Sequence, residues 1–252
     1  MRAITDSATM LRRQVKHIWR YPTLILTFAS VPVVFLLLFV YVLGGTMGAG
    51  IGADRAAYVG YLIPGIMITT IVGAAQGTAI SVATDMIEGI IARFKTMAIA
   101  RVSVLTGHVL GAMVQTFLAI AMVTVVALLI GFRPSASVVD WLGVVGVLAM
   151  FTFAITWLSV ALAMVTKNVA TASNLPMPLM LLPFLGSGFV PTESMPAGLR
   201  WFAEHQPTTP VIETLRALLA GRPAGSSFLE AAVWSAGIAL VSYLWARRLY
   251  NR

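Results

Sequence analysis

Long runs without charged residues dominate the pattern of this sequence. Residues 56–84 and 102–132 contain no Asp, Glu, Lys or Arg, and each run exceeds the ~20 residues that an α-helix needs to cross a bilayer. Shorter runs of similar character precede and follow them. The pattern therefore predicts an all-α membrane protein with six transmembrane helices, over residues 24–43, 59–84, 104–130, 141–165, 172–190 and 228–246.

Proline and glycine modify two of these predicted spans. The fifth contains Pro176, Pro178 and Pro183, and because each proline removes a backbone donor, we expect an irregular helix there. In the second span, Gly73 and Gly77 are four residues apart. This spacing lets two helix backbones approach closely.

Residues 1–22, ahead of the first span, form an amphipathic segment. Leu11, Val15, Ile18 and Trp19 share one helical face, and basic residues occupy the remainder. The segment predicts a helix that lies in the membrane interface. Its candidate interfacial residues are Arg12, Arg13, Lys16 and Trp19.

An island of charge, residues 85–101, joins the second and third predicted spans. Ile87, Ile90, Ile91, Phe94 and Ala98 recur at spacings of three and four, which places them on one face of a short helix. Such a helix lies in the headgroup layer or docks into a groove on a soluble partner. The residues by themselves leave both alternatives open.

The segment between the fifth and sixth spans, residues 191–227, is polar yet contains two apolar periodic stretches broken by Pro207 and Pro210. Each stretch is too short to span a bilayer. We therefore expect two short amphipathic helices that lie at the outer membrane face or re-enter the membrane partway.

Composition supports an integral membrane protein and offers little chemistry. Hydrophobic residues make up 59% of the chain, charged residues only 10%, and cysteine is absent. The sequence has no phosphate-binding Gly-x-x-x-x-Gly-Lys-Ser/Thr, no His-Glu-x-x-His, and three scattered histidines. We therefore expect no catalytic residue, no metal site and no cofactor bound by this chain.

The net charge of +8 is distributed unevenly between the predicted loops. If the N-terminus is inside, inner segments hold twelve of the 17 Lys and Arg residues and carry a net charge of +9, against −1 outside. This matches the positive-inside rule, and nucleic acid is not needed to explain the basic charge. We expect a multi-pass protein of the plasma membrane with both termini in the cytoplasm.

Two polar side chains within the predicted spans have alternative interpretations. Gln76 either forms a hydrogen bond between helices or lines a substrate path, and His108 is either an interfacial residue or a proton relay. An ion-coupled carrier usually has acids or bases at mid-membrane. Their absence counts against that class.

Longer motifs resemble a known family. Phe-Val-Pro at 189–191, Leu-Arg-Trp-Phe at 199–202, Gln-Pro at 206–207 and Leu-Arg-Ala-Leu-Leu-Ala-Gly at 215–221 look like the permease subunit of type 2 ABC exporters. Residues 85–95, residues 100–108 and Trp201 to Pro207 are similar to the membrane component of daunorubicin-resistance-type drug exporters. The resemblance extends over essentially the whole chain and implies one transmembrane domain, residues 1–252.

The resemblance also implies a mechanism. Two permeases, identical or homologous, form the pore, and two copies of a separate ABC ATPase bind ATP and Mg. Residues 85–101 become a cytoplasmic coupling helix, with Glu88, Gly89, Arg93, Phe94 and Lys95 as the ATPase-coupling residues. An amphipathic drug, antibiotic or lipid-like substrate passes between first and fifth spans of opposite subunits. The candidates for this path are Gln76, Phe35 and Phe184.

Two further functions remain as alternatives. One is a lipid or polysaccharide-precursor exporter of the same family. The other is a membrane-embedded enzyme acting on lipid-linked substrates, which needs acids or histidines clustered at one membrane face. The scattered acids of this sequence do not supply such a cluster.

The charge distribution makes a testable prediction about orientation. The chain has no cysteine, so a single introduced cysteine is a unique label. A cysteine in place of Ser194 should react with an impermeant thiol reagent added to whole cells, and one in place of Ser7 should react only after lysis. The reverse pattern of labelling would contradict the predicted orientation.

Overall fold

The computed structural model describes residues 22–45, 55–89, 103–166 and 168–250, and this part of the chain contains helices and turns but no strand. Four of its helices are long and apolar enough to cross a membrane, by length and composition. They are α4 (Arg55–Ile87), α6 (Ser103–Leu129), α7 (Val138–Met164) and α11 (Ser226–Tyr250).

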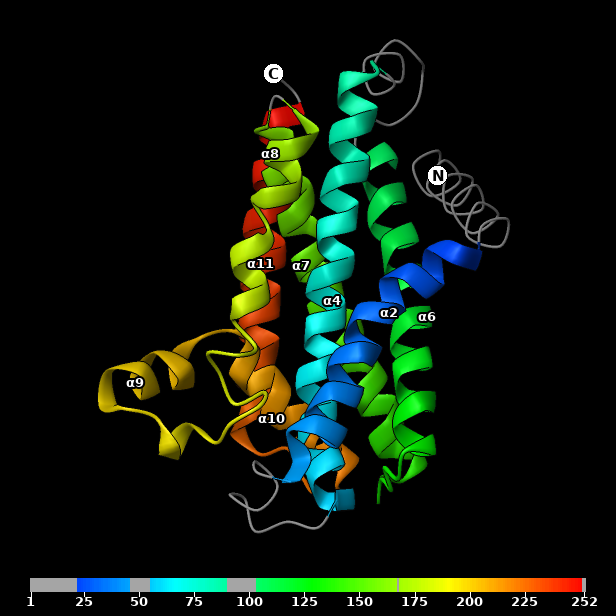
Figure 1. Cartoon of the computed structure of the whole chain (residues 1–252). Helices are drawn as coiled ribbons and strands as arrows, with labels where there is room; N and C mark the ends of the chain where they lie inside the picture. Colours follow the sequence, from blue (N-terminus) through cyan, green and yellow to red (C-terminus); the bar gives the residue numbers. More distant parts are fainter. Residues whose placement is uncertain (1–21, 46–54, 90–102, 167, 251–252) are drawn as a thin grey trace.

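Helix α4 is the central element of the bundle (Figure 1). It packs against α2 (Pro22–Leu37), α6, α7, α8 (Val169–Asn174) and α10 (Thr208–Leu219). From Leu62 to Ala75 its side chains are apolar or small around the whole circumference, and Leu62, Ile63, Ile66 and Met67 are fully buried. A helix that is apolar all round is one that is covered on all sides, and α4 meets this expectation within a single chain.

The long helices define two ends of the bundle (Figure 1). One end, here the Ile87 end, holds the end of α4, the start of α6, helix α8 and the end of α11. The opposite Arg55 end holds the start of α4, the turn after α6, helix α10 and the start of α11. Among the described residues, the alternating directions of α4, α6, α7 and α11 therefore place their predicted inner ends together and their predicted outer ends together.

The first predicted span continues from α2 into a short π-helix, η1 (Leu38–Val42). Pro32 lies within α2 and is accommodated there without ending the helix. π-helical turns are rare and occur mostly at functional sites. In this chain the π-helix carries Phe39, whose ring is buried.

The fifth predicted span is not a continuous helix. Its described part consists of α8, a 3₁₀-helix η2 (Met177–Leu181) and a series of turns that ends near Phe189. Pro176, Pro178 and Pro183 fall within this stretch and explain the irregularity, because proline donates no backbone hydrogen bond.

Both predicted amphipathic helices are present, but their environments differ. After a 3₁₀ turn η3 (Thr192–Ser194), α9 (Ala197–His205) lies to the side of the bundle (Figure 1) and leaves Trp201 65% exposed. Helix α10 instead packs against α4, α7 and α11, and buries Val211, Ile212 and Leu215 completely.

The positions of the other predicted spans agree closely with the helices. Residues 59–84, 104–130, 141–165 and 228–246 fall on α4, α6, α7 and α11, each with small differences at the ends. Helix α7 begins earlier than predicted because Ser137 and Asp140 form a capping box, in which each side chain accepts a hydrogen bond from the other residue's backbone N–H. The count of six spans stays a prediction.

A close backbone approach in the core joins Gly65 of α4 to Gly188 of the irregular residues 169–190, the broken segment. A Cβ atom on Gly65 would lie 2.5 Å from the carbonyl oxygen of Gly188. A Cβ atom on Gly73, by contrast, meets nothing within 4 Å. The expectation of close helix approach at Gly73 is therefore wrong within this chain, and the contact occurs two turns earlier.

We predict that Gly65→Ala lowers the thermal stability of the purified protein, because the added methyl group collides with backbone that cannot rotate away. Overpacking of this kind costs about 1–3 kcal/mol. Gly146→Ala on α7, where a Cβ atom also meets nothing within 4 Å, is the matched control and should leave stability unchanged or slightly raised. Equal unfolding midpoints for the two variants in detergent would show that the backbone contact is not tight.

Candidate functional site

A cavity of about 180 Å³ lies between α2 and α4. One wall is apolar and comes from Val31, Pro32 and Phe35 of α2, together with Met180 of η2. The opposite wall belongs to α4 and is formed by Thr69, Thr70, Gly73 and Gln76. The absent side chain of Gly73 thus widens the cavity. No charged side chain lines it.

The polar wall of this cavity offers hydrogen-bond acceptors more than donors. The Thr69 hydroxyl donates to the carbonyl oxygens of Gly65 and Ile66, at 3.0 and 2.8 Å, and Thr70 donates to Ile66 at 2.7 Å. With these protons already used, the hydroxyl oxygens retain lone pairs and the methyl groups add apolar surface. The wall suits a ligand that is largely apolar and brings a few donors of its own.

Gln76 forms the interhelical hydrogen bond that was one of its two interpretations, while its role in a substrate path stays a prediction. Its Nε2 atom donates to the carbonyl oxygen of Ser173 at 2.8 Å, which fastens α8 to α4. The same residue lines the cavity. The amide is therefore held by a neighbouring element while it contributes polarity to the wall.

Phe35 and Phe184 belong to a column of four aromatic rings. The Phe35 ring meets Phe184 edge to face at 6.0 Å between centroids, Phe184 stacks on Phe189 at 4.4 Å, and Phe189 stacks on Phe39 at 4.8 Å. Phe35 and Phe39 lie one helical turn apart on the α2–η1 helix. The column therefore joins the first span to the broken segment, and each ring pair adds about 0.5–1.5 kcal/mol beyond its buried area.

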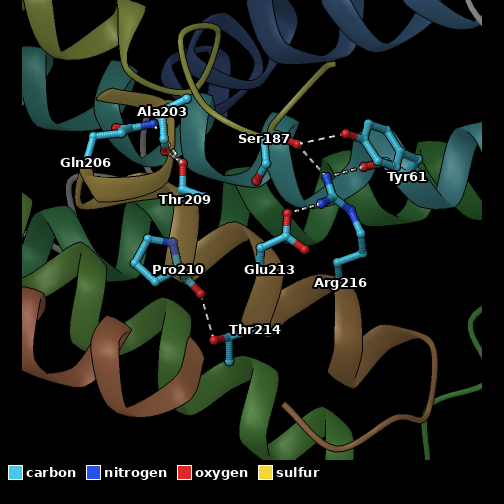
Figure 2. Close-up of polar contacts among 9 residues, drawn as sticks. All are labelled: Tyr61, Ser187, Ala203, Gln206, Thr209, Pro210, Glu213, Thr214 and Arg216. Carbon is cyan, nitrogen blue, oxygen red and sulfur yellow. Dashed lines mark hydrogen bonds and ion pairs between the residues drawn. The ribbon is translucent and has the colours of Figure 1, made fainter. Parts of the chain in front are cut away.

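At the Arg55 end, the broken segment is held by Arg216 of α10 (Figure 2). The Nη2 atom of Arg216 donates to the carbonyl oxygens of Ser187 at 2.6 Å and Tyr61 at 3.3 Å, while Nη1 pairs with Glu213 at 2.5 Å. The guanidinium also lies 3.9 Å from the centre of the Tyr61 ring, and the Tyr61 hydroxyl donates to Ser187 at 3.2 Å. Cation, ring and carboxylate together fix α4, α10 and the turn at Ser187 to one another.

A second polar group at the same end surrounds Gln206 (Figure 2). Its Nε2 atom donates to the carbonyl oxygen of Leu182 at 2.9 Å and to Thr209 at 3.1 Å, and its Oε1 atom accepts from the Thr208 hydroxyl at 2.7 Å. Thr209 in turn donates to the carbonyl oxygen of Ala203 at 2.5 Å. Gln206 is 3% exposed, so this buried amide is fully used in joining α9 and α10 to the broken segment.

The predicted coupling residues are only partly within the described chain. Glu88 and Gly89 form a turn directly after α4, where the Glu88 N–H donates to Thr84 and Gly89 adopts a φ of 72°. This left-handed conformation ends the helix at almost no cost for glycine. Arg93, Phe94 and Lys95 lie outside the described residues.

A polar contact between His108 and Asp85 joins the two helices that flank the predicted coupling segment. His108 Nε2 of α6 lies 3.0 Å from Asp85 Oδ2 near the end of α4, and the His108 side chain is 9% exposed. The His108 side chain is thus buried against a carboxylate, and its interpretations as an interfacial residue and as a proton relay both stay predictions. The pair brings the two ends of the 88–102 connection together.

The predicted interfacial residues Arg12, Arg13, Lys16 and Trp19 all lie outside the described residues, so their role stays a prediction. Sequence reasoning missed several residues that the structure brings to the site. Phe39 and Ser173 had no signal that distinguished them from ordinary apolar or small residues, whereas Phe189 and Arg216 lie within motifs that resemble the family. Asp85 and His108 had one, because each is a rare ionisable group close to an end of an apolar run.

Comparison with known proteins identifies the family. The family model named ABC-2 type transporter matches residues 6–220 of the sequence. The daunorubicin resistance ABC transporter permease protein DrrB1 of Streptomyces coeruleorubidus is 27% identical over 243 residues, which cover 92% of this chain and 81% of that protein. The probable doxorubicin resistance ABC transporter permease protein DrrC of Mycobacterium tuberculosis H37Rv is 23% identical over 210 residues, or 83% of this chain and 75% of that protein. With most of its length covered by the family model, this chain belongs to the ABC-2 type transporter family.

Proposed function

We propose that this chain is the membrane-spanning permease subunit of an ATP-driven exporter of amphipathic, drug-like compounds. The observation that carries the proposal is the cavity between α2 and α4, with its apolar wall, its acceptor-rich wall and no charged lining residue. The two relatives named for daunorubicin and doxorubicin resistance support the same class of substrate. A lipid-like compound is the alternative substrate.

The cavity chemistry favours such compounds over ions or sugars. An apolar surface gains about 25 cal/mol for each Å² removed from water, so flat hydrophobic ligands bind to the wall formed by Val31, Pro32 and Phe35. The Gln76 carbonyl and the Thr69 and Thr70 hydroxyl oxygens then accept hydrogen bonds from the ligand's polar groups. A sugar chain needs many paired donors and acceptors, which this cavity does not supply.

The aromatic column shares Phe35 with the cavity wall, and we propose that the column opens during transport. Separation of Phe35 and Phe39 from Phe184 and Phe189 would widen the space between the first span and residues 177–190. Each ring contact is worth only about a kilocalorie per mole. ATP-driven rearrangement therefore has to overcome a modest barrier here, whereas the hydrogen bonds of Arg216 and Gln206 keep the segment in place at one side.

The energy for this change comes from a partner. Membership of the family implies an ABC ATPase that works with the permease, and we propose that two ATPase copies bind ATP and Mg beneath two permease chains. Residues 85–101 would dock into the ATPase, with Phe94 as the anchor. The Asp85–His108 pair at the base of this segment supports the assignment, because it couples both flanking helices to any displacement. In this arrangement both termini face the cytoplasm.

We predict that Phe35→Ala reduces drug export. The substitution removes part of the apolar wall and the edge contact to Phe184, so efflux of doxorubicin from cells that produce the permease with its ATPase should fall at least severalfold. Phe153→Ala is the matched control, because Phe153 lies on α7 away from the cavity and is 38% exposed. Protein amount and unfolding midpoint are measured for both variants. If a stable Phe35→Ala protein exports doxorubicin at the wild-type rate, the cavity is not part of the substrate path.

A second prediction concerns the coupling segment. Phe94→Ala should release the ATPase, since truncating a buried interface aromatic commonly costs about 2 kcal/mol or more. Glu88→Ala and Arg93→Ala should retain more of the ATPase, because charges at an interface rim influence the association rate more than the affinity. The measurements are pull-down of the ATPase and drug-stimulated ATP hydrolysis, on variants that reach the membrane in normal amounts. If Phe94→Ala retains both, residues 85–101 rest on the membrane surface instead.

A further inference from the structure

A second, larger pocket lies at the Arg55 end of the bundle and is separate from the cavity between α2 and α4. Its volume is about 330 Å³, and the two share no lining residue. Three of its lining side chains are arginines, Arg133, Arg216 and Arg222, and Tyr61 lies among them. They come from the turn after α6, from α10 and from the segment after α10.

Two of these arginines are oriented by backbone carbonyl oxygens, and of the two only Arg216 also pairs with a carboxylate, that of Glu213. Arg133 Nη1 donates to Leu128 and Phe132, both at 3.1 Å, at the end of α6. Arg216 donates to Ser187 at 2.6 Å and lies against the Tyr61 ring. Side chains fixed in this way lose little additional freedom when a ligand binds, which favours binding.

Arg222 reaches the pocket because of the turn that precedes it. Gly221 has a φ of 66°, and the Arg222 N–H donates to the carbonyl oxygen of Ala217 at 2.9 Å. A Cβ atom on Gly221 would lie 2.8 Å from the carbonyl oxygen of Ser135. The glycine thus allows the end of α10 to meet the turn that carries Arg133, and so brings the arginines to one pocket.

The charge of this pocket is not balanced within the described part of the chain. Glu213 is the only carboxylate there within ion-pair distance of any of the three arginines, and it pairs with Arg216. The remaining charge is close to +2. The segments predicted to be outer contain only five of the 17 Lys and Arg residues, namely Arg55, Arg133, Arg200, Arg216 and Arg222. Three of the five therefore line a single pocket, at the end where basic residues are otherwise scarce.

The pocket also lies where the apolar surface of the bundle stops. Leu129 at the end of α6 is 81% exposed, and Val138 and Leu142 at the start of α7 are 79% and 69% exposed. Arg133 and Ser135, which line the pocket, belong to the turn between these two helices. In a bilayer, such apolar residues contact acyl chains, and the adjoining turn lies at the level of the headgroups.

We propose that this pocket binds the phosphate group of an anionic phospholipid from the adjacent leaflet. Guanidinium groups match phosphate oxygens with paired, charge-assisted hydrogen bonds. The net charge of the pocket, close to +2 within one chain, favours a headgroup with a net negative charge over a zwitterionic one. Inorganic phosphate shares the recognised group and is the other source to be distinguished.

The test uses the purified full-length chain in nanodiscs. Phosphatidylglycerol is titrated into discs of phosphatidylcholine, and bound lipid is counted by native mass spectrometry while the unfolding midpoint is recorded, because a ligand that binds only the folded state raises that midpoint. The double variant Arg133→Gln, Arg222→Gln should lose at least tenfold in affinity for phosphatidylglycerol. Arg200→Gln is the matched control, since Arg200 lies at the same end, pairs with Glu204 at 2.7 Å and does not line the pocket.

The outcomes separate the possibilities. Wild-type affinity in the double variant, or an equal loss in Arg200→Gln, overturns the proposal. Equal retention of phosphatidylcholine and phosphatidylglycerol by the wild type also overturns it, because charge is then not recognised. A rise in midpoint with inorganic phosphate alone, absent in the double variant, supports the phosphate site and assigns it to a soluble anion. None of these measurements depends on transport, so they stand apart from the export assays.

Discussion

A helix broken inside an apolar bundle leaves carbonyl oxygens without their usual donors, and the rest of this structure is arranged to supply them. Unpaired polar groups are costly in such surroundings, since no water is present to replace the lost hydrogen bond. Side chains from α4, from α10 and from Gln206, which lies between α9 and α10, donate to the broken segment. The pairs are Gln76 to Ser173, Gln206 to Leu182, and Tyr61 with Arg216 to Ser187. The irregular segment is thus fixed at three points, and the aromatic column and the cavity wall lie between them.

Much of the fold follows from the arrangement of charge along the sequence. Charge-free runs located the four long helices, and the three prolines anticipated the irregular fifth segment. The sequence could not tell which amphipathic helix is buried, because α9 and α10 have similar periodicity and differ only in what packs against them. It also could not locate the tight backbone contact. Gly65 and Gly73 look alike in sequence, and only the position of Gly188 distinguishes them.

The candidate site was predictable where a residue is chemically unusual for its surroundings. Gln76 is a polar side chain in an apolar run, and it does join two helices and line a cavity. Phe35 and Phe184 are ordinary residues for a membrane helix, and their aromatic neighbours depend on how two distant segments meet. The pairing of Asp85 with His108 spans the whole charged island, so no local pattern could reveal it. Arg216 lies in a motif that resembles the family, but its bond to Ser187 depends on a turn that no local pattern places.

The close contact between Gly65 and Gly188 would be the pivot of α4 if its Ile87 end were displaced. From Gly65 to Asp85 the helix contains no proline, and at 1.5 Å per residue this arm is about 30 Å long. Gln76 lies about 16 Å along the same arm. A sideways displacement of about 3 Å at Asp85 therefore moves Gln76 by roughly half as much, and Thr69 by less than 1 Å. Residues that line the cavity would therefore move less than the Ile87 end does. The displacement would be largest at the Gln76 amide and smallest at Thr69, beside the glycine contact.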